Sequence, residues 1–192
     1  MDEDLKADLD AKRRKRFVKT RLYQKTNRHE LSLRGGYFVS DVFDGSPLVS
    51  AAYSYHLTEG LAVEAAGAFT RVTTGAASEL ERLYDVVPGN TDTILFSTNL
   101  VFSPIYAKFQ FGAEVVRFDL QFTVGAGVVD SKISSGIAGN AGLGFVFWGG
   151  RAFALRFDFR NYVHQQELLA EKDWVNDLVA TVGFSTFLPF SE

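Results

Sequence analysis

The feature that most constrains the fold is an alternation of apolar and polar residues between Phe118 and Val128. One parity holds Phe118, Leu120, Phe122, Val124, Ala126 and Val128, and the other holds Asp119, Gln121, Thr123, Gly125 and Gly127. Because successive side chains of a β-strand point to opposite faces, this segment has one apolar face and one polar face. Soluble β-sandwiches also alternate, so this strand alone does not decide between a soluble and a membrane fold.

The same alternation recurs along the chain in segments of about 10 residues, the length that a tilted strand needs to cross a bilayer. The expected strands are 29–39, 48–57, 61–71, 93–103, 118–128, 137–147, 152–162 and 174–188. No run of 18 apolar residues is present, so a transmembrane helix is not expected. The sequence therefore predicts an all-β fold, an antiparallel up-and-down transmembrane β-barrel of eight strands over residues 29–190.

The connections between these strands differ in length. A long polar break covers residues 72–92, with a short helix-like piece at 78–84, and a tight turn at 58–60 precedes it. Long loops outside the cell and short periplasmic turns are typical of outer-membrane barrels, which places both termini in the periplasm. Residues 163–173 are expected to form another outward loop. Residues 104–117 fit a periplasmic connection with local structure, or an extra hairpin that would give ten strands.

Residues 1–28 form a charged segment before the first strand. Acidic residues come first, and a basic run of Lys12, Arg13, Arg14, Lys15 and Arg16 follows. We interpret this segment as a solvated, partly helical periplasmic arm, because acids first and bases last suit a helix dipole. The alternative is an arm that docks on a partner or on anionic headgroups. Met1 to Asp4 do not resemble a signal peptide, so we expect that an export signal has been removed.

The polar face of the barrel carries charged residues that the parity directs inward. They are Glu30, Arg34, His56, Glu64, Asp119, Arg156, Asp158 and Arg160. A charge on the lipid side costs about 2–4 kcal/mol at the midplane, which fixes this orientation. The interior of an eight-stranded barrel is just wide enough for side chains to fill. We therefore expect a salt-bridged, filled lumen without a diffusion pore, with a proton or ion path through the charges as the alternative.

Aromatic and small residues are expected on the outer wall. Trp148, Trp174, Tyr53 and Tyr55 are candidates for the two membrane–water interfaces, where amphipathic rings gather. Small residues at Ala51, Gly67, Gly139 and Ala141 leave room for a neighbouring copy, so a homo-oligomer is an open alternative. Outer-membrane lipid and lipopolysaccharide are the expected surroundings of this wall.

The sequence offers little sign of catalysis. It has no cysteine, and its three histidines are too scattered for a metal-ligand spacing. A net charge of −3 argues against nucleic-acid binding, and no phosphate-binding loop is present. We therefore expect no enzyme activity, metal or cofactor. The alternative is a hydrolase or acyltransferase site around His164, which is expected in an outward loop near Glu167 and Asp173.

Four stretches together resemble a known family. They read His-Glu-Leu-Ser-Leu-Arg-Gly-Gly-Tyr at 29–37, Ala-Tyr-Ser-Tyr-His-Leu-Thr-Glu-Gly-Leu-Ala-Val-Glu at 52–64, Ser-Pro-Ile-Tyr-Ala-Lys-Phe at 103–109, and the alternating strand at 118–128. They are similar to the outer-membrane β-barrel domain family common in myxobacteria and related deltaproteobacteria, some members of which are linked to adventurous gliding motility. The resemblance covers about residues 12–188 and implies no catalytic residues.

This resemblance favours a subunit that anchors periplasmic or outer-membrane proteins in a cell-envelope complex, such as a motility or trafficking machine. A small outer-membrane channel is the second interpretation. An adhesin or enzyme that works through the outward loops is the third.

Overall fold

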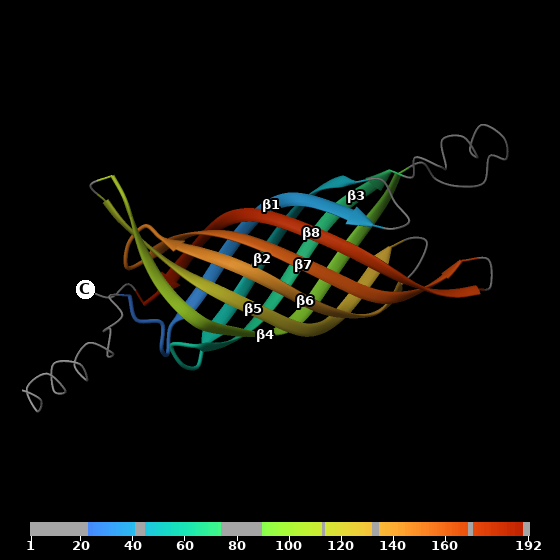
Figure 1. The fold of residues 1–192 in the computed structure, drawn as a ribbon. Coiled ribbons are helices and arrows are strands. Elements are labelled where there is room, and N and C mark those ends of the chain that lie inside the picture. Colours follow the sequence, from blue (N-terminus) through green and yellow to red (C-terminus); the bar gives the residue numbers. More distant parts are fainter. Residues whose placement is uncertain are drawn as a thin grey trace, which may run out of the picture.

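The computed structural model describes residues 23–40, 45–73, 90–112, 114–131, 135–168 and 171–189. Eight strands form a closed antiparallel barrel in which each strand pairs with the next and β1 pairs with β8. The strands are β1 His29–Ser40, β2 Ser46–His56, β3 Leu61–Thr73, β4 Asn90–Phe111, β5 Glu114–Ser131, β6 Ser135–Trp148, β7 Phe153–Leu168 and β8 Glu171–Leu188. The predicted eight-stranded up-and-down barrel is confirmed (Figure 1).

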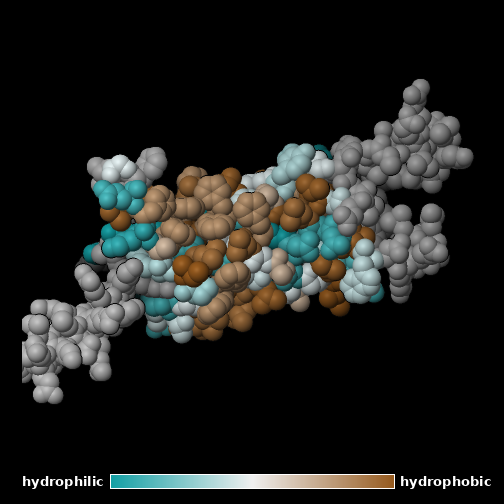
Figure 2. Space-filling model, viewed as in Figure 1, coloured by the Kyte–Doolittle hydropathy of each residue, from teal (hydrophilic) through white to brown (hydrophobic). Residues whose placement is uncertain are grey.

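The alternation in the sequence becomes an apolar outside and a polar inside. On β1, Leu33 is 72% exposed whereas the neighbouring Ser32 and Arg34 are buried. Apolar residues cover much of the wall, as the broad brown area in Figure 2 shows. A soluble protein would hide these side chains, whereas in a bilayer the lipid tails cover them. No helix in the described part of the chain is long and apolar enough to cross a membrane.

The barrel has two distinct ends. The terminus end carries the start of β1, the end of β8 and the short turns at 57–60 and 149–152. At the opposite end, the loop end, β1, β3, β5 and β7 end and β2, β4, β6 and β8 begin. Residues 1–22, including the basic run from Lys12 to Arg16, lie outside the described residues, as do residues 74–89 with the expected helix-like piece.

The region 104–117 differs from its favoured interpretation as an irregular connection. It continues β4 and β5 into one long hairpin, so it adds length to two strands and leaves the strand number at eight. A bulge between Phe102 and Ile105 separates the barrel part of β4 from the extension. Gly112, with a positive φ of 63°, forms part of the turn at the tip, where glycine is favoured. The hairpin extends beyond the barrel at the terminus end (Figure 1).

The expected outward loop at 163–173 is also mostly strand. β7 continues to Leu168 and β8 begins at Glu171, and their register runs without a break from Asn161↔Leu178 to Leu168↔Glu171. This segment is polar, because both faces of a hairpin that extends outside the bilayer meet water. Without an apolar face it shows no alternation, so the sequence analysis did not recognise it as strand. Within the described residues, β4–β5 extends the barrel at the terminus end and β7–β8 extends it at the loop end.

Candidate functional site

All eight charged residues that the sequence directs inward are buried inside the barrel. They come from five strands, β1, β2, β3, β5 and β7, and the alternation along each strand sets their inward direction. Their side chains fall into one central network and one smaller group near the terminus end.

Arg156 lies at the centre of the network and is 1% exposed. Its guanidinium donates to Glu30, to the amide oxygen of Gln121 at 2.8 Å and to both carboxylate oxygens of Asp158 at 3.2 and 3.3 Å. His56 Nε2 lies 2.8 Å from the second carboxylate oxygen of Glu30. Residues from four strands are therefore joined through one cation.

Glu64 is the second node and is fully buried. Arg34 reaches one of its oxygens at 2.8 Å, and Arg160 reaches the other at 2.7 Å. The amide of Asn99 donates to Glu64 at 3.0 Å, and Asn140 donates to Asn99 at 2.9 Å. Asp158 joins the two nodes, because Arg34 lies 3.6 Å from it.

The central network is electrically balanced. Three guanidinium groups, on Arg34, Arg156 and Arg160, face three carboxylates, on Glu30, Glu64 and Asp158. Buried charges are tolerated when they are paired, and each of these six groups lies within ion-pair distance of an opposite charge. The arrangement fills the lumen and holds strands from opposite sides of the barrel together.

An apolar ring closes the lumen on the loop side of this network. Each of the eight strands contributes one buried residue to it: Phe38, Leu48, Val72, Leu95, Val129, Ala138, Tyr162 and Val179. The sequence analysis missed this ring, although its members stand at inward parity near the loop end of every strand. Water entering from the loop end meets an apolar layer before it reaches the charges.

The terminus end is closed by residues 23–28, which the sequence analysis assigned to the solvated arm. Lys25 is 1% exposed, and its Nζ lies 2.7 Å from Asp119 Oδ2 inside the barrel. The carboxylate of Glu59 accepts hydrogen bonds from the backbone N–H groups of Lys25 and Thr26, at 2.9 and 3.0 Å. Residues 23–28 therefore belong to the barrel plug and not to a solvated arm.

Arg28 fastens the same segment to the closing strand. Its guanidinium donates to the carbonyls of Gln24, Arg151, Phe187 and Pro189 at 3.0–3.2 Å. Burial lowers the pKa of Arg28 and Glu59 opposes this shift, but an arginine stays charged at neutral pH. Sequence reasoning missed Lys25 and Arg28 because they continue a charged arm without a change in composition.

Substitution Lys25→Met is expected to release residues 23–28 from the barrel. Asp119 would keep a hydrogen bond from the indole N–H of Trp148, at 3.2 Å, so we expect a loss of about 1–3 kcal/mol rather than global unfolding. Amide hydrogen exchange of residues 23–28 measures the effect and should accelerate about tenfold or more. The matched variant Lys108→Met removes an exposed lysine and should leave this exchange unchanged.

The expectation that Trp148 lies at the membrane interface is wrong. β6 continues through Trp148, so its side chain takes the inward parity, opposite to Phe147, and is 7% exposed. The indole stacks on Tyr23, with ring centroids 5.3 Å apart, and packs against Phe187 at 4.6 Å. The ring thus belongs to the plug at the terminus end.

The other three candidate interface aromatics lie on the outer wall. Trp174 is 67% exposed near the loop end. Tyr53, 43% exposed, and the half-buried Tyr55 lie beside His29 at the terminus end, and the hydroxyl of Tyr53 is 2.7 Å from His29 Nδ1. A row of phenylalanines continues this belt across β4–β7, with successive ring centroids 5.7–6.0 Å apart: Phe109, Phe118, Phe147 and Phe157.

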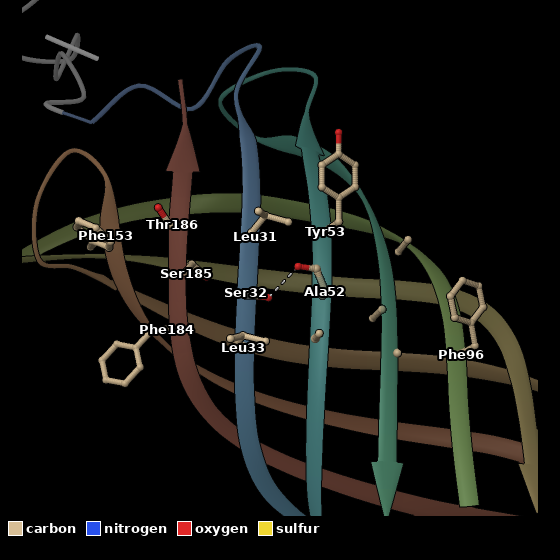
Figure 3. A pocket seen from close by; sticks show the side chains of 14 residues that line it. Leu31, Ser32, Leu33, Ala52, Tyr53, Phe96, Phe153, Phe184, Ser185 and Thr186 are labelled. Carbon is tan, nitrogen blue, oxygen red and sulfur yellow. Dashed lines mark hydrogen bonds between the residues drawn. The ribbon is translucent and has the colours of Figure 1, made fainter. Parts of the chain in front are cut away.

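An apolar groove of about 800 Å³ crosses the outer wall over β8, β1, β2, β3 and β4 (Figure 3). Ala51, Ala65 and Gly67 are among its lining residues. Phe96 and Phe184 stand at its two sides in Figure 3. Ala51 pairs with Gly67 in the register, so two of the small residues noted in the sequence lie together. The other two, Gly139 and Ala141, lie on β6 and do not line this groove.

His164 does not lie in an outward loop. It belongs to β7, is 5% exposed, and its Nδ1 lies 3.5 Å from Asp177 Oδ2 on β8. The side chains of Glu167 and Asp173, its expected neighbours, lie outside the described residues. Within the described part of the chain, no cluster of three or more histidine or acidic side chains could hold a metal ion.

Solved structures with the same fold include outer-membrane proteins. OprG from Pseudomonas aeruginosa matches with a TM-score of 0.51 and 12% identity, over 86% of this chain and 98% of that one. AlkL, determined in lipid bilayers, matches with a TM-score of 0.51 and 13% identity, over 91% and 96%. No family model and no curated protein matches the sequence. The chain therefore has the fold of an outer-membrane β-barrel.

Proposed function

We propose that this barrel is a non-catalytic outer-membrane subunit that anchors a periplasmic protein complex through its terminus end. The observation that carries the proposal is the contrast between its filled interior and its extended terminus end. The lumen holds a balanced charge network between an apolar ring and a plug, an arrangement that favours an anchor over a channel. The β4–β5 hairpin instead offers a surface beyond the barrel wall.

The orientation follows from the general plan of these proteins, in which both termini and the short turns lie in the periplasm. The short turns 57–60 and 149–152 lie at the terminus end, together with residues 23–28 and the long hairpin. A partner in the periplasm would meet these elements first. The resemblance seen in the sequence suggests motility or trafficking as the envelope process, and this part of the proposal rests on that resemblance alone.

Crosslinked pull-down from gently solubilised outer membranes tests the anchoring role. Three chains are compared: the full chain, a chain that lacks residues 1–22, and a chain whose hairpin is shortened by joining Lys108 to its register partner Arg117 through a two-residue turn, which keeps Asp119 and Gln121. The first truncation stops at residue 22 because Lys25 and Arg28 belong to the barrel plug. We expect a defined set of periplasmic proteins that is lost with the hairpin. Absence of partners from all three samples would contradict the proposal.

A channel is the main competing function, and planar bilayer recording separates it from an anchor. We expect no conductance steps from the purified barrel at neutral pH, because a plug, a salt-bridged layer and an apolar ring lie in series along the lumen. A general porin added to the same bilayer provides the positive control. Reproducible single-channel steps from the purified chain would favour the channel instead.

A further inference from the structure

A small chamber lies inside the barrel between the central network and the apolar ring. Arg34 and Arg160 of the network are among its lining residues. Leu48, Tyr162 and Val179 of the ring also line it. These residues come from β1, β2, β7 and β8, which are neighbours in the closed barrel. The chamber therefore lies beside the seam where β1 pairs with β8.

Four polar side chains line this chamber and keep hydrogen-bonding capacity that no described residue uses. The hydroxyl groups of Ser50, Tyr162 and Thr181 have no hydrogen-bond partner among the described residues. Arg160 approaches its two carboxylate partners through Nη2, at 2.7 and 3.9 Å, which leaves the donors on Nε and Nη1 for another acceptor. Buried polar groups are almost always hydrogen-bonded, either to protein or to ordered water. The chamber therefore suits a small ligand that both donates and accepts hydrogen bonds.

The size of the chamber matches one water molecule. The space open to the centre of a water molecule is about 20 Å³. A volume of about 10–15 Å³ suffices for one water, which then makes about three hydrogen bonds to two to four polar partners. The partners in this chamber are Ser50 on β2, Arg160 and Tyr162 on β7, and Thr181 on β8. Volume and polar lining thus both meet the requirements for a bound water.

The charge balance of the network favours a neutral ligand over an ion. Three guanidinium groups already face three carboxylates in the lumen. An anion would add a buried charge without a counter-charge, which is costly away from water. A cation would meet the guanidinium groups of Arg34 and Arg160 directly. Water carries no net charge, accepts hydrogen bonds from a guanidinium and donates them to hydroxyl oxygens.

We propose that this chamber binds one water molecule, which accepts a hydrogen bond from Arg160 and bridges the hydroxyl groups of Ser50 and Thr181. The water connects β7 and β8 with β2 and so fastens the barrel across the seam between β8 and β1. The apolar ring lies on the loop side of the chamber and separates the water from the loop end. This inference does not depend on the anchoring function.

The test is a crystal structure of the full chain, grown from a lipid mesophase with sodium bromide, at a resolution that shows ordered water. We expect one peak without anomalous bromine signal, within about 3.2 Å of at least three of the four polar groups. Variant Ala66→Val adds two methyl groups to the chamber lining and should displace the peak. Variant Thr123→Val changes a buried residue of β5 outside the chamber and should leave the peak in place.

A second variant keeps the test decisive if Ala66→Val does not fold. Ser50→Ala combined with Thr181→Val removes two of the expected partners without adding volume, and the peak should disappear. An anomalous bromide peak in the chamber would overturn the proposal, because an anion would then occupy it. Absence of any peak from the full chain would also overturn it, as would a peak that persists unchanged in the double variant.

Discussion

Substitution Arg156→Met is expected to lower the free energy of unfolding of the barrel by about 3–5 kcal/mol. Arg156 is 1% exposed and contacts Glu30, Gln121 and Asp158. Its loss leaves two carboxylates in the lumen with one cation fewer, and neither can move to water because the apolar ring and the plug close the two ends. Urea unfolding in lipid vesicles, followed by tryptophan fluorescence, measures the change.

Two controls distinguish the effect of removing a buried charge from the effect of removing any arginine. Arg71→Met removes an exposed cation whose partner Asp92 lies 2.8 Å away, and solvent screens such a surface pair, so we expect little change in stability. The double variant Glu30→Gln with Arg156→Met should lose less than the sum of the two single variants, because the acid and the base disappear together. Equal losses for Arg156→Met and Arg71→Met would show that the network does not support the barrel.

Gly183→Ala is expected to prevent proper closure of the barrel. Gly183 pairs with Arg34 on one side and Arg156 on the other, so it leaves room for two inward arginines. A Cβ at this position would lie 2.1 Å from Leu33 O and 2.6 Å from the Cα of Arg34. Both are backbone atoms of β1, so the seam between β1 and β8 would have to open. We expect a loss of about 3 kcal/mol or more.

The yield of barrel that folds from urea into vesicles reports this effect. Gly35→Ala supplies the matched control, because Gly35 lies on the same pair of strands and nothing stands within 4 Å of its added Cβ. We expect normal folding of Gly35→Ala and a strongly reduced yield of Gly183→Ala. Normal folding of both variants would mean that the seam tolerates a wider spacing than the register implies.

Alternation over segments of about 10 residues predicted the barrel and the direction of each lumen charge, whereas residues 104–117 left eight or ten strands open until the structure showed eight. A charged side chain on a barrel strand faces either the lipid or the lumen. The large free-energy cost of placing it in lipid excludes the first orientation. The same rule failed for Trp148 because the strand end was placed one residue early, and a shift of one residue reverses the face. Periodicity is therefore informative in the middle of a strand and weak at its ends.

The parts that could not be predicted depend on contacts outside the bilayer. Strand residues beyond the membrane no longer need an apolar face, so the hairpin ends at Phe111 and Leu168 resemble loops in sequence. Likewise, the burial of Lys25 depends on Asp119, a residue 94 positions away in the chain. The apolar ring, in contrast, could have been predicted from the sequence, because inward apolar residues recur near the loop end of every strand.

The central claim is that this barrel works through its terminus end. Site-specific photocrosslinking in whole cells tests it most directly, with a crosslinking residue placed at Gln110 on the hairpin or at Ile137, an exposed residue near the loop end. We expect Gln110 to crosslink to a defined set of periplasmic proteins and Ile137 to crosslink to none of them. Protein crosslinks from Ile137 with none from Gln110 would contradict the account and place the function at the loop end.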